Sequence, residues 1–432
     1  MKSLCVLGMG YIGLPTAITF AKHGMTVHGV DINHKIIEKL QSGEIHIEEP
    51  GLQNIFDEVL AAGNLTFGTT PVTADAYIIA VPTPINPDNT ANIDYVRSAT
   101  NSIIPYLKSQ TLVVLESTVP PRTVEDHLIP ILSKSHLRIG EELFISHSPE
   151  RVIPGRLLEE LINNDRVIGG INEKSVHLTK TLYSCFVKGN MHSTDATTAE
   201  MVKLMENTYR DINIAFANEM ALIAEKIGFN VWEAIRLANF HPRVNIHRPG
   251  PGVGGHCIAV DPWFIYEQTP ELAKLVHTAR LTNDYMPSFV AEKTKSLLEG
   301  INNPKVAALG LAFKGNVDDT RESPAILAIK KISEFASVSI YDPHVKENWT
   351  SKVDTYEECL INADVLLLLT DHDEFKSISP NFASQLMKNK IVFDTRNLLE
   401  RKLWAEHGFE VHLLGNPSNN LNKVPIHQTP QR

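Results

Sequence analysis

The sequence predicts an α/β protein in which two doubly wound domains are joined by a central helical domain with one long bridging helix. Short apolar runs alternate with helical patterns in two separate regions, near the two ends of the chain. Between them, residues 194–228 have a helix-forming composition and end on Gly228, where a helix normally terminates. At about 1.5 Å per residue this helix extends roughly 50 Å, enough to bridge two domains. We therefore expect domains at residues 1–192, 193–300 and 301–416.

The apolar runs lack the in/out alternation of half-exposed strands, as expected for parallel strands covered by helices on both faces. In the first domain the expected strands are residues 3–8, 26–31, 77–81, 112–116, 143–147 and 166–170. In the last domain they are residues 305–310, 338–342, 365–370, 391–394 and 409–414. The final segment, residues 417–432, is rich in Asn, Pro, Ser and Gln, so we expect it to be disordered.

Composition excludes several classes of protein. The net charge of -10 and the lack of clustered Lys and Arg argue against a nucleic-acid partner. No apolar run reaches the roughly 20 residues that span a bilayer, and the start leads into a glycine turn instead of a cleavage site. We therefore expect a cytoplasmic protein without a membrane partner. The four cysteines lie far apart with no Cys-x-x-Cys pair, which predicts reduced thiols and no metal site.

The first strand leads directly into a G-x-G-x-x-G turn that opens a helix, and the second strand ends in Asp31. This context predicts a Rossmann-like dinucleotide site, because glycines let backbone amides approach a pyrophosphate and an acid at that distance bonds the ribose. Asp31 would repel a 2′-phosphate, so NAD is favoured over NADP. The alternative is an ordinary glycine turn. The candidate cofactor contacts here are Gly8, Gly10, Tyr11, Ile12, Gly13 and Asp31, with Thr83 and Thr118 beyond two later strand ends.

Residues 249–262 place four glycines within six residues, immediately before Cys257. A lone cysteine is usually a small buried hydrophobe, and we interpret Cys5, Cys185 and Cys359 in that way. Cys257 differs because flexible glycines permit close approach to a ligand, and His256 supplies a polar neighbour. A thiolate beside a nicotinamide can add to an aldehyde, which allows a second oxidation to a thioester that water then hydrolyses.

On the bridging helix, Glu200, Lys203, Asn207 and Arg210 are spaced by three or four residues and therefore share one face. An ordinary solvated stripe is the alternative to a face that lines a cleft between domains. If the face lines a cleft, Lys203 can carry away a proton or stabilise an oxyanion, and Asn207 can donate a second bond.

Two loops carry further candidate binding residues. Glu150 and Arg151 follow a strand end and would face the same cleft, although a plain loop with a surface ion pair explains the pattern equally well. Residues 313–324 join the first strand of the last domain to its first helix, where such folds bind phosphates. Lys314 and Arg321 would supply positive charge there.

Six motifs in order resemble the UDP-glucose/GDP-mannose dehydrogenase family over nearly the whole chain. They are G-x-G-Y-x-G at the start, Ser-Thr-Val-Pro at 117–120, Ser-Pro-Glu-Arg at 148–151, Glu200 through Lys203 to Asn207, Gly-Gly-His-Cys at 254–257, and Phe313-Lys314 through Arg321 to Pro324. The resemblance implies an N-terminal NAD domain, a C-terminal UDP domain and a homodimer interface formed by the central helices. It implies two successive NAD-linked oxidations at C6 of a UDP-sugar, which yield a uronic acid.

By this resemblance, Cys257 matches the nucleophile and Lys203 the acid/base or oxyanion residue. Asn207 and Asp261 match residues that support the adduct and position water, and Glu150 matches a carboxylate that helps hydrolysis. The candidate catalytic residues are thus Cys257, Lys203, Asn207, Asp261, Glu150 and Thr118. Those matching substrate contacts are Arg151, Val152, Lys203, Asn207, Arg210, His241, Arg243, Gly254, Phe313 and Lys314, while Arg321 matches a cofactor contact.

One departure from the pattern of the family narrows the range of expected substrates. UDP-glucose members typically carry a lysine directly before the aspartate that corresponds to Asp261, and this chain has Val260 there. Residues 241–244 and 254–264 are most similar to members that oxidise UDP-N-acetyl-D-mannosamine to its uronic acid. UDP-N-acetylglucosamine and UDP-glucose remain alternative substrates. A two-electron dehydrogenase of the hydroxyacid type and a non-catalytic NAD sensor are the alternatives from other classes.

Overall fold

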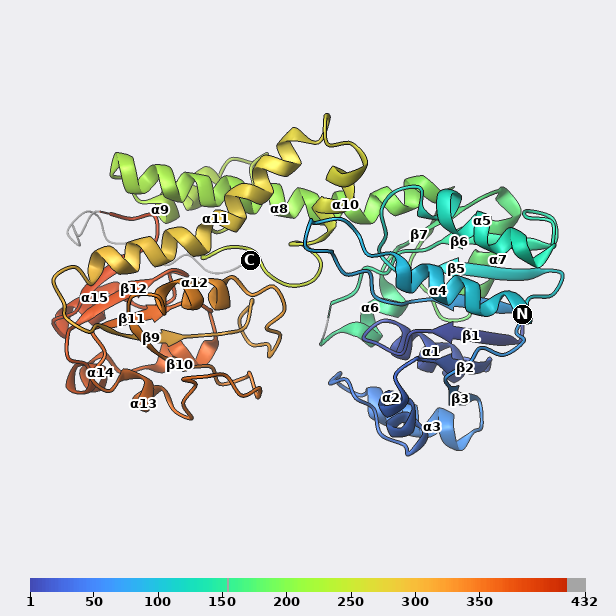
Figure 1. Ribbon diagram of the computed structural model, residues 1–432, viewed down its shortest axis with the longest axis horizontal. Coiled ribbons are helices and arrows are strands. Elements are labelled where there is room, and N and C mark those ends of the chain that lie inside the picture. Colours follow the sequence, from blue (N-terminus) through green and yellow to red (C-terminus); the bar gives the residue numbers. More distant parts are fainter. Residues whose placement is uncertain (154, 418–432) are drawn as a thin grey trace. The chain divides into compact units, whose positions relative to one another are not determined.

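The computed structural model describes residues 1–153 and 155–417, which form two compact units (Figure 1). The first unit comprises Met1–Glu206 and Trp263–Leu272. The second comprises Asn207–Pro262 and the chain from Ala273 onward. Helix α8 (Ala196–Ile227) contributes residues to both units, and so does helix α10 (Asp261–Gln268).

The first unit contains an eight-stranded sheet in the order β3-β2-β1-β4-β5-β6-β7-β8, parallel throughout except that β7 is antiparallel to β6. The strands are β1 (Ser3–Leu7), β2 (Thr26–Val30), β3 (Leu65–Gly68), β4 (Ala76–Ile79), β5 (Thr111–Leu115), β6 (Leu143–His147), β7 (Arg166–Gly170) and β8 (Met191–Asp195). The six predicted strands are confirmed, and the two edge strands β3 and β8 were not predicted. Strand β8 is largely polar and exposed, so it lacks the apolar run that marks an inner strand.

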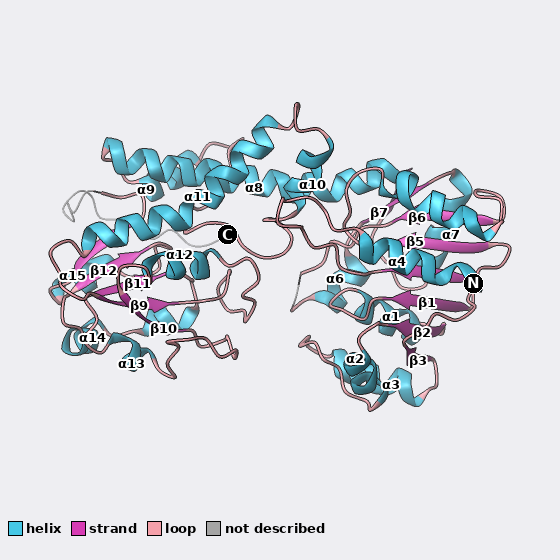
Figure 2. Cartoon of the chain, in the orientation of Figure 1, coloured by secondary structure: helices cyan, strands magenta, loops and turns pink. Residues whose placement is uncertain are grey.

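Helices cover both faces of this sheet (Figure 2), and the two cores meet the strands on opposite sides. Leu4 and Val6 of β1 point into one core, and Cys5 and Leu7 into the other. The first core is completed by α1 (Gly13–Lys22), α2 (His34–Gln41), α3 (Leu52–Ala61), α6 (Leu157–Asn163) and α7 (Glu173–Tyr183). The second is completed by α4 (Asp94–Ile103), the π-helix η2 (Val124–Leu128) and α5 (Ile129–Leu132). The short 3₁₀ helices η1 (Ile104–Tyr106) and η3 (Ser133–Ser135) flank them.

The second unit contains a five-stranded parallel sheet in the order β10-β9-β11-β12-β13. Its strands are β9 (Lys305–Leu309), β10 (Ser337–Tyr341), β11 (Val365–Leu368), β12 (Ile391–Asp394) and β13 (Glu410–Leu413), which confirms all five predicted strands. Helices α9 (Val231–Ala238), α11 (Lys274–Leu297) and α12 (Pro324–Ile332) share one core with α8. Helices α13 (Tyr356–Leu360), α14 (Pro380–Leu386) and α15 (Arg401–Glu406) and the 3₁₀ helix η4 (Asp373–Ser377) lie on the other core.

The two doubly wound sheets and the helices between them confirm the predicted fold class. The division into residues 1–192, 193–300 and 301–416 stays a prediction. Of the predicted disordered tail, residues 418–432 lie outside the described residues. Over the described part of the chain, no helix combines the length and the apolar character needed to cross a membrane.

Helix α8 is anchored in the first unit by a buried acid. Glu200 is only 1 % exposed, so it does not belong to a solvated stripe. Its Oε2 accepts a hydrogen bond from the Arg122 N–H (2.5 Å) and its Oε1 one from the Val124 N–H (2.9 Å). These bonds satisfy amides at the start of η2. Burial raises the pKa of Glu200 to about 8, although both backbone bonds favour the charged form.

We expect this raised pKa to make stability fall as pH rises. Between the ordinary pKa of 4.5 and about 8, the unfolded chain has lost the Glu200 proton while the folded protein retains it. Stability therefore falls by up to about 1.4 kcal/mol per pH unit in this window. Glu200→Gln cannot ionise, so its stability should not fall through this window, although its NH2 group cannot accept the second backbone N–H and this costs about 1–3 kcal/mol at every pH. Urea unfolding across that range measures the difference.

The matched control is Glu159→Gln, because Glu159 is an exposed partner of Arg156 on the surface. Its unfolding curves should track those of the wild type at every pH. Parallel pH profiles for Glu200→Gln and the wild type would contradict the assignment.

Candidate active site

The glycine turn after β1 has the form that a pyrophosphate requires. Gly8 has φ +93°, and a Cβ there would lie 2.5 Å from the Ala80 carbonyl oxygen. A Cβ on Gly13 would lie 1.8 Å from the Gly8 oxygen, so the helix can approach the strand only with glycine. A Cβ on Gly10 would meet no heavy atom within 4 Å. The first and third glycines thus serve packing, and the second leaves open space for a ligand.

Asp31 holds this turn against the end of β2. Its Oδ2 accepts a hydrogen bond from the Met9 N–H (2.9 Å), and its Oδ1 one from the Asn33 N–H (2.9 Å). The half-buried carboxylate therefore lies beside the turn, where a ribose acid is expected. Tyr11 is 42 % exposed and Ile12 half-buried at the start of α1. These positions fit a dinucleotide whose pyrophosphate lies at the helix N-terminus.

The two candidate threonines lie together at the ends of neighbouring strands. Thr83 follows β4 and Thr118 follows β5, and the Thr83 hydroxyl donates to the Thr118 carbonyl oxygen. The Ser117 hydroxyl donates to the Val81 carbonyl oxygen at 2.7 Å and fastens the same two loops. Both threonines are half-buried. The carboxyl edge of the sheet thus carries the turn, Asp31 and both threonines, as predicted for a cofactor crevice.

Glu150 and Arg151 are not an ordinary surface pair. The Glu150 side chain is 8 % exposed, and its Oε2 lies 2.5 Å from a guanidinium nitrogen of the buried Arg166. Arg151 pairs instead with Glu206 of α8 at 2.9 Å. Val152, which follows, is half-buried. The sequence analysis did not single out Arg166, because it appeared there only as the first residue of an apolar strand.

In the second unit, three candidate catalytic residues are close to one another. The Asn207 side-chain amide donates to Asp261 Oδ2 at 2.5 Å, and both residues are buried. The backbone N–H groups of Val260 and Asp261 donate to the Cys257 carbonyl oxygen at 3.1 Å and 2.8 Å. Cys257 therefore lies one turn before Asp261, and it is half-buried. The turn places a thiol near a carboxylate, and α8 brings the Asn207 amide to the same carboxylate.

The glycines before Cys257 have a packing role that the sequence analysis did not anticipate. A Cβ on Gly254 would lie 2.6 Å from both Phe313 Cβ and the Glu322 carbonyl oxygen. Gly255 has φ +80° and donates its N–H to the Arg321 carbonyl oxygen at 2.9 Å. The cysteine loop therefore packs directly on the loop between β9 and α12, and only glycine permits this approach.

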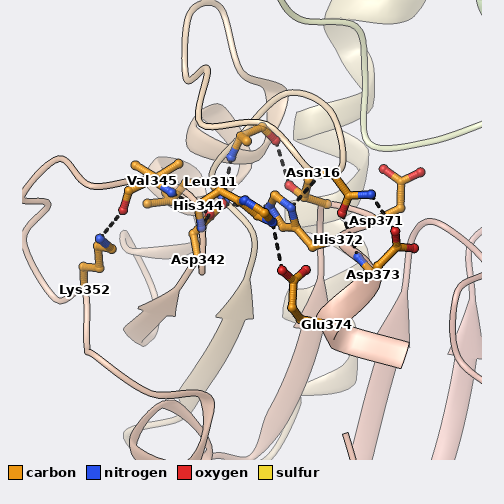
Figure 3. A network of polar contacts seen from close by, with 12 residues as sticks. Leu311, Asn316, Asp342, His344, Val345, Lys352, Asp371, His372, Asp373 and Glu374 are labelled. Atoms are coloured by element: carbon orange, nitrogen blue, oxygen red, sulfur yellow. Dashed lines mark hydrogen bonds and ion pairs between the residues drawn. The ribbon is translucent and has the colours of Figure 1, made fainter. Parts of the chain in front are cut away.

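The loop between β9 and α12 is held by a buried network (Figure 3). Asp342, which follows β10, accepts the Leu311 N–H at 2.6 Å, and His372 Nε2 lies 3.0 Å from the same Oδ2. The Asn316 N–H donates to His372 Nδ1 at 2.9 Å. Burial works against the charge of Asp342, but the bonds from His372 and from backbone amides hold its pKa well below the ordinary range. The network thus fixes both ends of the segment that carries Phe313 and the exposed Lys314.

The sequence analysis missed Asp342 and His372. A signal was present, because Asp342 ends the second strand of its sheet as Asp31 does in the first. His372 had no such signal, since its hydrogen-bond partners, Asn316 and Asp342, come from two segments that are distant in the sequence.

One cluster of potential metal ligands, His344, His372 and Glu374, adjoins this network, with ligand atoms within 4.8 Å of one another. His372 Nδ1 accepts the Asn316 amide, so the ring proton is on Nε2, which donates to Asp342. His372 therefore has no lone pair for a metal unless the network opens. Hydrogen bonding accounts for this cluster.

The remaining candidates lie in separate parts of the two units. Lys203 of α8 is half-buried in the first unit. Three candidates are exposed in the second unit, namely Arg210, His241 and Arg243. The loop after His241 and Arg243 is held by α8, because the His247 N–H donates to the Asn213 side chain at 2.9 Å. Arg321 forms two bonds to Asp319, at 2.6 Å and 2.9 Å. Convergence of the candidates from the two units on one substrate stays a prediction.

Comparison with protein families gives three consecutive matches. Residues 2–187 match the NAD binding domain of the UDP-glucose/GDP-mannose dehydrogenase family, residues 197–285 its central domain and residues 307–401 its UDP binding domain. The NAD binding domain covers the glycine turn, Asp31 and both threonines, so NAD is the cofactor that this site takes. The UDP binding domain covers the network around Asp342.

Individual relatives extend over nearly the whole chain. A UDP-N-acetyl-D-mannosamine dehydrogenase from Methanococcus maripaludis is 50 % identical over 426 residues, which cover 96 % of this chain and 97 % of the relative. Among solved structures, the UDP-N-acetyl-mannosamine dehydrogenase from S. aureus superposes with a TM-score of 0.88 at 46 % identity, covering 96 % of this chain and 99 % of that chain. The UDP-D-ManNAc dehydrogenase from Pyrococcus horikoshii gives a TM-score of 0.91 at 42 % identity, covering 96 % and 99 %.

We expect Asp31→Ser to weaken the preference for NAD over NADP. The variant loses a charge-assisted bond to the ribose, worth about 1.5–3 kcal/mol, and it no longer repels a 2′-phosphate. The kcat/KM for NAD should fall by about 10–100-fold while that for NADP rises. Initial rates with each dinucleotide measure the ratio. Asp57→Ser, which removes an exposed carboxylate on α3 of the same unit, should leave it unchanged. An unaltered ratio in Asp31→Ser would refute the ribose contact.

Proposed function

Because this chain belongs to the UDP-glucose/GDP-mannose dehydrogenase family, we propose that it oxidises C6 of UDP-N-acetyl-D-mannosamine to the carboxylate in two NAD-dependent steps. The observation that carries the proposal is the turn in which Cys257 precedes Asp261, with Asn207 bonded to that aspartate. A thiol supported by an amide and a carboxylate suits a reaction that passes through a covalent adduct.

Two observations support N-acetylmannosamine as the sugar. Relatives and solved structures named for this substrate match at 42–50 % identity over 96 % of the chain. Val260 stands where UDP-glucose members typically carry lysine, and it is only 6 % exposed. A buried valine offers no charge or hydrogen bond to a sugar hydroxyl, which favours a different set of substrate contacts.

In the proposed first oxidation, the C6 alcohol loses a proton and a hydride and becomes an aldehyde. When bound, NAD would supply the hydride acceptor for one oxidation, and a second NAD would replace the NADH before the next. Lys203 takes the alcohol proton or stabilises the developing oxyanion, and Asn207 donates a hydrogen bond to the same oxygen. The amine of Lys203 has no hydrogen-bond acceptor among residues 1–153 and 155–417, so no internal bond must break for this role.

In the proposed second oxidation, the Cys257 thiolate adds to the aldehyde carbon and forms a thiohemiacetal. Loss of a second hydride and a proton converts this adduct to a thioester. Water then attacks the thioester carbonyl, Glu150 takes a proton from that water, and the carboxylic acid leaves as the thiol is restored. Asp261 and Asn207 position the water and the adduct, and Thr118 lies with Thr83 beside the cofactor.

The proposed substrate contacts divide between the units. Arg151 and Val152 come from the first unit, and Arg210, His241, Arg243, Gly254, Phe313 and Lys314 from the second. The network around Asp342 and His372 supports Phe313 and Lys314 at the UDP end. Arg321, bonded to Asp319, is proposed as a cofactor contact.

We also propose that the chain forms a homodimer through its central helices. Eight large apolar side chains among the described residues of the second unit are at least 43 % exposed on or beside α8, α9 and α11, namely Tyr209, Phe216, Ile227, Leu237, Phe240, Leu275, Leu281 and Tyr285. Single exposed apolar residues are common, but a concentration on a few helices is typical of a protein–protein interface.

The substrate assignment predicts two NADH for each UDP-sugar consumed. We expect the highest kcat/KM with UDP-N-acetyl-D-mannosamine, followed by UDP-N-acetylglucosamine and UDP-glucose. A pocket that recognises one epimer discriminates by about 10–200-fold when it gains or loses a single contact. Absorbance at 340 nm with limiting sugar gives both the rate and the yield. One NADH per sugar would rule out the four-electron reaction, and equal rates with all three sugars would rule out the epimer assignment.

The covalent scheme predicts that Cys257→Ser loses complete turnover. A serine hydroxyl is a far weaker nucleophile than a thiolate, so we expect steady-state NADH formation to fall by about 10³-fold or more. The first oxidation does not need the thiol, and a trapping reagent should reveal the aldehyde. Cys185→Ser is the control, because Cys185 is exposed and lies outside the site. Near-normal turnover in Cys257→Ser would favour a two-electron dehydrogenase without a covalent step.

A further inference from the structure

A buried arginine, Arg166, joins two loops and helix α7 at the carboxyl edge of the first sheet. Its side chain is 4 % exposed and lies between two carboxylates, Glu150 at 2.5 Å and Glu116 at 3.5 Å. Its guanidinium also stacks over the Tyr183 ring, with 4.2 Å between the guanidinium carbon and the ring centroid. An arginine buried to this degree requires specific partners, and here each partner comes from a different element.

The reversal of one strand brings Arg166 to this edge. Strand β7 is antiparallel to β6, with Ser146 opposite Gly170 and His147 opposite Gly169. Continued past the last pair, this register brings Arg166 level with Glu150. The first residue of β7 therefore lies at the edge where the parallel strands β4 and β5 end, beside the proposed cofactor loops.

The position of Arg166 depends on Glu116, which is itself fixed by two hydroxyl groups. The Tyr183 hydroxyl donates to Glu116, and the Thr16 hydroxyl of α1 donates to the other oxygen of Glu116 at 3.5 Å. Burial raises the pKa of Glu116 to about 7, and Arg166 opposes that effect. These bonds connect the helix after the glycine turn to the arginine, and the arginine to Glu150.

Glu150 has little freedom as a result. Its Oε2 is bonded to Arg166, and its Oε1 accepts the Arg151 N–H at 3.0 Å. Each carboxylate oxygen uses one lone pair for these bonds and keeps another. The carboxylate can therefore still accept a proton from water, while the two bonds fix its orientation.

We propose that Arg166 is the positioning residue that orients Glu150 for hydrolysis of the thioester, a role that rests on the proposed function. Arg166 touches neither substrate nor cofactor in this scheme and acts only through Glu150. Water supplies the oxygen of the acid, Glu150 accepts the water proton, and Cys257 leaves as the thiol. Loss of Arg166 therefore slows this last step and spares the two oxidations before it.

The test is a pre-steady-state measurement of NADH with UDP-N-acetyl-D-mannosamine. In Arg166→Met we expect a rapid burst of two NADH per subunit, followed by a steady state about 10–100-fold slower than in the wild type. The acyl-enzyme on Cys257 should accumulate and appear as added mass on the intact protein. KM and the burst rate should stay close to the wild-type values. A purely structural arginine would instead lower all rates together and give no burst.

Three further variants make the result specific. Glu150→Gln should show the same burst, and adding Arg166→Met to it should cause no further loss, because both changes disable one function. Arg166→Lys keeps the charge but donates from a single nitrogen and lacks the planar fork that reaches Glu150, Glu116 and Ser148, so it should restore only part of the steady-state rate. Arg138→Met is the matched control, since Arg138 also pairs with two carboxylates but is 68 % exposed.

The outcomes separate the two proposals. A wild-type enzyme that forms no NADH with any UDP-sugar would overturn the proposed function. A wild type that forms two NADH, with additive losses in the double variant and no acyl-enzyme in Arg166→Met, would overturn only the role of Arg166. If Arg166→Met does not fold, Arg166→Lys decides, because the proposal still requires a burst and a slower steady state.

Discussion

Both parallel sheets depend on the same interaction. In each, an aspartate just after the second strand accepts a backbone N–H from the loop that follows the first strand. Asp31 accepts the Met9 amide, and Asp342 accepts the Leu311 amide. The two acids then differ in their surroundings. Asp31 is half-buried and lies beside the open space at Gly10, whereas Asp342 is buried and bonded to His372. The first sheet thus keeps its acid beside open space, where we propose that it bonds a ribose, and the second uses its acid to hold a loop.

The chemistry is supported by a second layer of buried polar groups. The chain carries a net charge of -10, yet its proposed UDP-sugar substrate is an anion. Exposed cations, among them Arg210, Arg243 and Lys314, are proposed to bind this anion locally. Arg166 has a different task, because it is buried and paired with Glu150 and Glu116. Desolvated pairs of this kind stabilise a unique geometry more than they stabilise the fold. They orient the groups that the proposed reaction needs.

The proposed site also requires that backbone segments approach one another closely, and glycines permit this. Gly13 lets α1 approach Gly8, and Gly254 and Gly255 let the cysteine loop lie on Phe313 and the Arg321 backbone. The sequence analysis attributed the glycines before Cys257 to ligand approach alone. In the structure they also connect the Cys257 loop to the segment proposed to bind UDP, so packing and function place the same demand on these positions.

The sequence by itself determined the fold class, the glycine turn with Asp31, and the candidates Cys257 and Asn207, because these signals are local: apolar runs mark strands buried on both faces, and spacing marks a shared helix face or turn. Asp261 became a candidate only through the family resemblance. It did not reveal β3 and β8, since edge strands lack those runs. Only the tertiary structure decided that Arg166 meets Glu150 and that His372 meets Asp342. Such pairs depend on strand order and direction, which bring together residues that no local pattern relates.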